Sequence, residues 1–307
     1  MDQRHKAPIY DRTIGDIGNI VEFGHVNVRV PDQRLANLFY IMGLGLTRDP
    51  YLVVGIDNMW VNAGASQFHL PTGEAQVLRG TTGLVVPDLD ALRRRLAAVA
   101  PRLAGTRFAW YDAADAIDLT CPWGNRLRAH APDERLGRIT LGMPYVELDA
   151  PPGSAEGIAR FYGEVLHGLV SVEEDVRGRF ARIVAGPLST IRFRETDAVQ
   201  PAYDGNHIQI TLADFSGPYR RLLARGLVSE ESSQHQYRFQ DVVDPGSGDP
   251  LVRIEHEVRS MRHPMGARAL VNRNAEQNNN RYAAGHEAWP PAMPPEEEGP
   301  QPRPAFL

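Results

Sequence analysis

A fourfold repeat constrains the fold of this chain more than any other feature of its sequence. Four stretches alternate polar and apolar residues and lead into a helical pattern, and they begin at residues 25, 82, 145 and 207. Two of the helical stretches carry an aromatic pair, Phe39 with Tyr40 and Phe161 with Tyr162. A supersecondary unit that recurs along the chain is the signature of modular architectures. The sequence therefore predicts four similar modules.

Short runs with a period of two follow each opening, for example 67–70 after the first and 190–194 after the third. This period is typical of half-buried strands. Residues 1–20 show weak periodicity and predict an irregular N-terminal arm. The segment 263–307 is rich in proline and glutamate, and it predicts a flexible tail because it has too little apolar surface to offset the entropy of ordering.

Composition and charge exclude several classes of partner and cofactor. The net charge of −5 without a basic run argues against nucleic acid. Cys121 is the only cysteine, which excludes an intramolecular disulfide and any multi-cysteine zinc or iron–sulfur site. Gly43 and Gly45 follow a helix and not a strand, so we expect no nucleotide cofactor. With neither a secretory signal nor a long apolar segment, we expect a cytoplasmic protein with no membrane partner.

Three motifs carry a resemblance to a known family. They are G-H-V-x-V-x-V from Gly24, F-Y-x(3)-L-G from Phe39, and D-P-x-x-G from Asp244, the last followed by a strand that contains Glu255. Over roughly 21–258 the chain resembles the vicinal oxygen chelate superfamily, which includes glyoxalase I, bleomycin-binding proteins and type I extradiol dioxygenases. The resemblance implies an α+β fold of four βαβββ modules that form two paired, cupped-sheet (half-barrel) domains. We expect domain 1 at 21–135 and domain 2 at 136–262.

In this family a divalent metal, held in the cupped sheet by His and Glu, polarises two neighbouring oxygens of the substrate. In domain 2 the resemblance implies that His207 and Glu255 are the metal pair and that they form the catalytic set with Tyr145. Arg192 occupies the remaining ligand position. Two alternatives stay open: Glu257 lies on the same strand face as Glu255 by parity, and Arg192 could pair with Glu255 in a purely structural contact.

In domain 1 the resemblance places His25 and His69 at ligand positions, but Arg128 stands where a carboxylate belongs. Arginine cannot ligate a metal, so we expect domain 1 to have lost its metal. The predicted substrate-binding residues lie in both domains, and they are His25, His69, Arg128, Arg192 and Trp60. The alternative for His25 and His69 is a polar, solvated strand face.

These observations predict a small-molecule enzyme that is extradiol-dioxygenase-like or glyoxalase-like, with one divalent metal (Fe²⁺, Mn²⁺ or Zn²⁺) on an incomplete ligand set. The competing hypothesis is a metal-free protein of the same fold that binds or sequesters a small molecule, with Arg128 and Arg192 holding a polar or anionic ligand. The expected partners are a small-molecule ligand and, as an option, a second copy of the chain.

Overall fold

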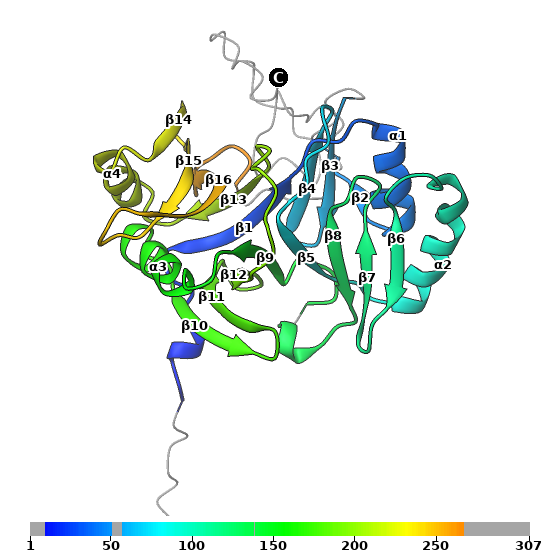
Figure 1. Ribbon diagram of the computed structural model, residues 1–307, viewed down its shortest axis with the longest axis horizontal. Helices are drawn as coiled ribbons and strands as arrows, with labels where there is room; N and C mark the ends of the chain where they lie inside the picture. Colours follow the sequence, from blue (N-terminus) through cyan, green and yellow to red (C-terminus); the bar gives the residue numbers. More distant parts are fainter. Residues whose placement is uncertain (1–9, 51–56, 138, 267–307) are drawn as a thin grey trace, which may run out of the picture.

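The computed structural model describes residues 10–50, 57–137 and 139–266, and four βαβββ modules fill most of this length (Figure 1). Module 1 holds β1 (Ile20–Asn27), α1 (Gln33–Ala36), the π-helical η2 (Asn37–Gly43), β2 (Thr47–Arg48), β3 (Asn58–Ala63) and β4 (Ser66–Pro71). Module 2 holds β5 (Gly80–Val85), α2 (Leu89–Val99), the 3-10 turn η3 (Ala100–Arg102), β6 (Ala109–Asp112), β7 (Ala116–Thr120) and β8 (Arg126–His130).

Modules 3 and 4 repeat this order. Module 3 holds β9 (Tyr145–Ala150), α3 (Ala155–Arg160), the π-helical η5 (Phe161–Val165), β10 (Val170–Asp175), β11 (Gly178–Val184) and β12 (Thr190–Glu195). Module 4 holds β13 (His207–Leu212), α4 (Ser216–Ala224), β14 (Val228–Ser233), β15 (Gln236–Val243) and β16 (Pro250–Ser260). Short 3-10 helices lie before module 1, at Thr13–Gly15, and after module 2, at Glu134–Leu136. The predicted α+β fold with four modules is confirmed.

The strands form two eight-stranded sheets that pair the modules across the chain. Sheet 1 has the order β14-β15-β16-β13-β1-β4-β3-β2 and joins modules 1 and 4. Sheet 2 has the order β10-β11-β12-β9-β5-β8-β7-β6 and joins modules 2 and 3. The central contacts are antiparallel, β1 with β13 and β5 with β9. Each sheet thus takes one module from each predicted domain.

The helices associate differently from the strands. In the first half of the chain α2 contacts η2, and in the second half α4 contacts η5 (Figure 1). Modules 1 and 2 therefore pack through their helices while their strands belong to different sheets. The domain boundaries at 21–135 and 136–262 stay a prediction.

Local signals in the sequence explain where the helices begin and which face they bury. Asp88 caps α2, because its side chain accepts a hydrogen bond from the Ala91 backbone N–H at 2.9 Å. Leu92, Leu96 and Val99 follow at helical spacing, and all three are buried. Phe39, Tyr40, Phe161 and Tyr162, the two aromatic pairs of the repeat, are fully buried in the core.

The central strand β13 shows how the sheets position polar groups. Ile208 and Ile210 lie in the apolar core, and the alternate residues His207 and Gln209 lie on the opposite face. Both sets are buried, so this strand is not half-buried as its period of two predicts. A buried polar face must find partners for its hydrogen-bonding groups, and this face of sheet 1, called here its inner face, holds the candidate site.

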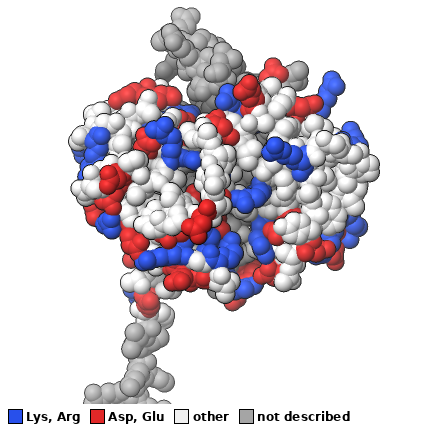
Figure 2. All heavy atoms as spheres, in the orientation of Figure 1, with Lys and Arg blue, Asp and Glu red and all other residues white. Residues whose placement is uncertain are grey.

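The outer surface carries charges of both signs. On the face shown in Figure 2, acidic and basic side chains alternate, and basic ones gather over β10–β12 beside acidic ones. None of the helices in the described part of the chain combines the length and apolar character that crossing a bilayer requires. The N-terminal arm is described only from residue 10, and the tail predicted at 263–307 lies outside the described residues from 267 onward.

Candidate metal centre

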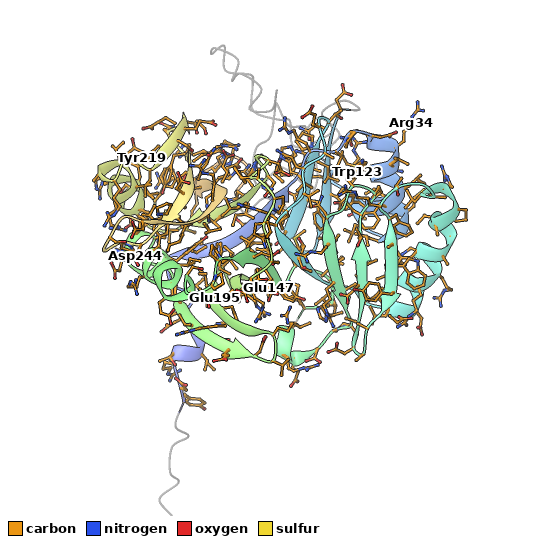
Figure 3. All side chains as sticks on the ribbon, viewed as in Figure 1. Arg34, Trp123, Glu147, Glu195, Tyr219 and Asp244 are labelled. Atoms are coloured by element: carbon orange, nitrogen blue, oxygen red, sulfur yellow. The ribbon has the colours of Figure 1, made fainter. Side chains whose placement is uncertain are left out.

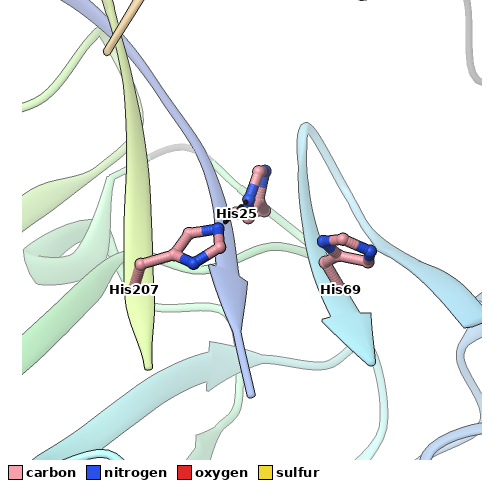
Figure 4. A group of neighbouring side chains, drawn as sticks. All are labelled: His25, His69 and His207. Atoms are coloured by element: carbon pink, nitrogen blue, oxygen red, sulfur yellow. Dashed lines mark hydrogen bonds between the residues drawn. The ribbon is translucent and has the colours of Figure 1, made fainter. Parts of the chain in front are cut away.

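Three histidines from adjacent strands meet on the inner face of sheet 1 (Figure 4). His25 comes from β1, His69 from β4 and His207 from β13. One ring nitrogen of each lies within 4.8 Å of the others, and the Nε2 atoms of His25 and His207 are 3.3 Å apart. The side chains are almost completely buried, at 1%, 3% and 6% exposed. We call these three residues the histidine cluster.

Strand pairing brings the cluster together from distant parts of the chain. β1 runs parallel to β4, so His25 lies opposite Gln67 and Asn27 opposite His69. On its other side β1 runs antiparallel to β13, where Asn27 lies opposite His207. The three imidazoles therefore approach one another diagonally across β1. A register slip of one residue would turn them into the apolar core.

Burial keeps all three imidazoles neutral near pH 7. It lowers the pKa of His207 to about 3. Burial also holds the pKa of His25 well below its usual value, and Arg259 and His207 add to the effect. The pKa of His69 is lowered by burial and by the two neighbouring imidazoles. Neutral imidazole is the form that ligates metals.

Two carboxylates flank His207 on opposite sides of its ring. Glu255 Oε1 lies 3.5 Å from Nδ1, and Glu257 Oε2 lies 3.6 Å from Nε2. Nε2 of His207 faces His25 Nε2 as well as Glu257, and Nδ1 faces Glu255. Glu255 is therefore placed to orient His207, and Glu257 is the carboxylate on the ligand side of the ring.

Two arginines compensate the charge of these carboxylates. Arg238 contacts Glu255 and lies 2.6 Å from Glu257, and Arg259 lies 2.6 Å from Glu257 on its other oxygen. Burial alone would raise the pKa of Glu257, but Arg259, His207 and Arg238 lower it to about 2. Glu257 is therefore ionised, and its charge is already balanced by the protein.

Trp60 and Asn27 fix the orientation of His69. The Trp60 and His69 rings stack with centroids 3.8 Å apart at an interplanar angle of 15°, and the edge of His25 meets Trp60 at 5.0 Å. The Asn27 side-chain amide lies 2.6 Å from His69 Nδ1. Trp60 is fully buried. These contacts hold both imidazoles in place.

A cavity of about 320 Å³ reaches the histidine cluster at His25. Polar side chains from four strands of sheet 1 line it, and they are Glu22, Gln67, Gln209, Thr211 and Arg259. Thr211 Oγ1 donates to Glu22 Oε2 at 2.8 Å and accepts from Gln209 Nε2 at 3.1 Å. A small polar group can therefore approach the cluster from this side.

The histidine cluster fits a divalent metal by its donor chemistry and spacing. Two ligands each about 2.1 Å from a tetrahedral metal are about 3.4 Å apart, which is close to the 3.3 Å between His25 and His207 Nε2. Among the described residues, it is the one group of three or more histidines, cysteines or carboxylates whose ligand atoms converge in this way. Three buried histidines can thus form a metal site.

Sheet 2 carries a different set of residues at the corresponding place. The Tyr145 ring lies over Gly83, where a Cβ atom would come within 2.5 Å of it. The Arg192 guanidinium carbon lies 4.4 Å from the centre of that ring, and His130 Nε2 lies 2.9 Å from its hydroxyl. Burial raises the pKa of Tyr145 to about 12, so the phenol is neutral. The stack of Tyr145 and Arg192 lies on the face of sheet 2 that carries Tyr145, which we call the inner face of sheet 2.

The fold has relatives among solved structures, although no protein-family model and no curated protein matches the sequence. Glyoxalase I from Zea mays aligns with a TM-score of 0.55 at 12% identity, over 78% of this chain and 92% of the maize chain. A Bacillus subtilis strain 168 protein assigned as a dioxygenase gives 0.53 at 15% identity, over 79% of this chain and 86% of its own. The chain has the vicinal oxygen chelate fold. At these identities the likeness concerns the fold, so the chemistry must be argued from the site.

Within the vicinal oxygen chelate fold, the pairing of modules separates residues that the sequence grouped together. Tyr145 and Arg192 lie in sheet 2, on β9 and β12, and His207 and Glu255 lie in sheet 1. The alternative in which Arg192 pairs with Glu255 is wrong, because Glu255 contacts Arg238. The predicted catalytic set is therefore divided between two sheets.

The same pairing unites residues that the sequence assigned to different sites. His25 and His69, predicted to bind substrate, lie beside His207, and their burial excludes a solvated strand face. Arg128 does not join the histidine cluster. It lies on β8 in sheet 2, near Asp115 and Asp118.

Sequence reasoning missed Asn27, Arg238 and Arg259 as neighbours of the cluster. Only the alternation of polar residues along β1, β15 and β16 could have indicated them. Glu257 was predicted as an alternative to Glu255, because residues two apart on a strand share one face.

Proposed function

We propose that this protein is a metal-dependent enzyme that acts on a small molecule with two neighbouring oxygens at the inner face of sheet 1. The observation that carries the proposal is the histidine cluster, which offers three buried, neutral imidazoles from three adjacent strands. The fold relatives support the same reading, since one is a glyoxalase I and one is assigned as a dioxygenase.

His25, His69 and His207 would hold the metal, with Glu257 as the carboxylate beside them. A bound divalent metal supplies Lewis acidity that polarises substrate oxygens. An imidazole-rich set suits zinc and iron better than manganese, so we favour Zn²⁺ or Fe²⁺ among the three predicted ions. Glu255 keeps its predicted place at the site, but as the group that orients His207.

The other residues of the site hold the reacting groups and their protons. Trp60 and Asn27 orient His69, and Arg238 with Arg259 keeps Glu257 ionised. Glu22 lies on the cavity wall, where among the described residues Thr211 alone donates a hydrogen bond to it. Because Oε2 accepts from Thr211, Glu22 would accept a substrate proton at Oε1. Tyr145 has no part in this chemistry because it lies in the other sheet.

Metal analysis tests the proposal directly. Protein stripped with a chelator and reloaded with Zn²⁺ or Fe²⁺ should retain one equivalent after desalting, as measured by elemental analysis. His25→Ala should retain none, and the matched control His130→Ala in sheet 2 should retain one. Wild-type protein that holds no stoichiometric metal would contradict the proposal. Oxygen uptake during turnover then separates a dioxygenase from an isomerase, which consumes none.

A second candidate function is supported by sheet 2. Among the described residues Arg192 forms no ion pair, and its guanidinium is stacked on Tyr145. A carboxylate or phosphate ligand could occupy such a group in a metal-free binding protein. This candidate predicts a rise in melting temperature with small anions that Arg192→Leu abolishes. Whether the chain forms a homodimer stays a prediction.

A further inference from the structure

An apolar cavity of about 310 Å³ adjoins the polar cavity that reaches the histidine cluster. Glu22, Ala65, Thr211 and Gly266 line both cavities, so the two share a common border. Beyond this border the lining changes character. The polar side chains give way to apolar ones, among them Val21, Ala185, Pro187, Leu188 and Met261.

The wall of the apolar cavity comes from both sheets. Val21 belongs to β1 of sheet 1, and residues 185–189 connect β11 with β12 in sheet 2. Gly186 has φ +87°, and a Cβ atom there would lie 2.6 Å from the Val21 carbonyl oxygen. This close approach, which a side chain would prevent, holds the 185–189 connection against β1. The cavity is therefore built into the packing of the two sheets.

Two large apolar side chains at this cavity remain exposed to water. Leu188 is 39% exposed and Met261 is 61% exposed. Single exposed apolar residues are common, but these two line the same cavity, Leu188 from the connection between β11 and β12 and Met261 from the position after β16. Pockets that combine an apolar wall with a few polar groups at one end are typical of small-molecule sites. The polar end here is the one that reaches His25.

We infer that the substrate is amphipathic: its pair of oxygens lies in the polar cavity at the histidine cluster, and an apolar group next to them fills the cavity walled by Val21, Leu188 and Met261. The inference rests on the proposed function for the position of the oxygens. It adds a substrate class that neither the fold nor the histidine cluster specifies.

Two hydroxamates of different chain length test this inference, since a hydroxamate carries two adjacent oxygens. Acetohydroxamate and octanohydroxamate are titrated calorimetrically into Zn²⁺-loaded protein. Each methylene buried strengthens binding about fourfold, so three buried methylenes would make octanohydroxamate about 60-fold tighter. Leu188→Glu and Met261→Glu should each weaken octanohydroxamate at least about tenfold and leave acetohydroxamate unchanged. Both side chains are exposed, so neither substitution removes a core contact.

Leu223→Glu is the matched control, because Leu223 is a similarly exposed leucine on α4 that lines neither cavity. It should alter neither affinity. Equal affinity for the two hydroxamates, or an octanohydroxamate preference that survives Leu188→Glu and Met261→Glu, would overturn the inference and leave the metal proposal standing. Failure to load Zn²⁺ is seen separately, before any hydroxamate is added. It would overturn the proposed function and, with it, the placement of the oxygens.

Discussion

The inner faces of the two sheets have the same strand pattern and opposite chemistry. In sheet 1 the central strands bring together three neutral imidazoles, and the charge of the neighbouring Glu257 is balanced by arginines. In sheet 2 the central strands bring together Tyr145, Arg192 and Glu147. Glu147, labelled in Figure 3, is buried and paired with Arg177 and Arg194. The face of sheet 1 offers imidazole lone pairs to a ligand, and the face of sheet 2 pairs its buried carboxylate with arginines.

A glycine on the first strand of each sheet makes the difference concrete. A Cβ atom at Gly24 would collide with the Gln209 amide, which lines the polar cavity, and a Cβ atom at Gly83 would collide with the Tyr145 ring. The space next to the glycine is thus occupied by the Gln209 amide in sheet 1 and by the Tyr145 ring in sheet 2. A duplicated architecture can keep a site in one copy and convert the other into structure.

The largest expected difference between the sheets is in metal affinity. His207→Ala removes a ligand and should weaken Zn²⁺ binding more than about 100-fold, since losing an outer partner of a ligand already costs 10- to 100-fold. His130→Ala, in sheet 2, should leave the affinity unchanged. Competition with a chromophoric chelator measures both. Equal losses in the two variants would remove the distinction between the sheets.

The second difference concerns stability. Arg194→Met breaks a buried ion pair with Glu147 but leaves Arg177 as a partner, so we expect a loss of about 2–3 kcal/mol in the free energy of unfolding. Arg126→Met, which breaks an exposed pair with Asp149 in the same sheet, should cost less than about 1 kcal/mol. Urea denaturation measures both, and Zn²⁺ affinity should change in neither. A weakened metal site in Arg194→Met would show that the sheets are coupled.

The third difference is in pH dependence. The folded-state pKa of His207 is about 3 and its ordinary value is 6.5. Below pH 6.5 this imidazole binds a proton in the unfolded chain but not in the folded chain. The free energy of unfolding therefore falls as the pH is lowered from 6.5 toward 3. The slope is about 1.4 kcal/mol per pH unit for this histidine.

Urea denaturation of the metal-free protein at pH 7, 6 and 5 checks this expectation. His207→Gln should show a shallower loss of stability at low pH than the wild type. His130→Gln should change the slope less, because His130 is only half-buried and its pKa is lowered by this partial burial and by Arg128. A slope that His207→Gln leaves unchanged would count against a neutral, buried His207.

The smallest expected effect lies in the groups that orient the cluster. Asn27→Leu removes the amide at His69 Nδ1 without touching a ligand atom, and it should weaken Zn²⁺ binding about tenfold. Asn27→Asp replaces the amide donor by an acceptor that favours a proton on Nδ1 and a free lone pair on Nε2, so it should restore part of the loss. A loss as large as that of His207→Ala would instead make Asn27 part of the ligand set.

The sequence alone was enough for the modules and for the polar faces. The alternation of His207 with Ile208 and of Glu255 with Ile254 places each polar residue on the inner face, because side chains in a strand alternate. Likewise, the motifs around Gly24, Phe39 and Asp244 predicted the vicinal oxygen chelate fold that the solved relatives confirm. Local periodicity carries this information, and it depends on neighbours only a few residues away.

Only the tertiary structure decided which histidines meet. His25 and His207 are separated by 182 residues, and their contact exists because β1 pairs with β13. The four opening strands have similar alternating patterns, and backbone hydrogen bonds would be satisfied by any pairing among them. The choice of partner depends on side-chain packing between modules distant in sequence, which no local pattern encodes. It placed Tyr145 and Arg192 in one sheet and the histidine cluster in the other.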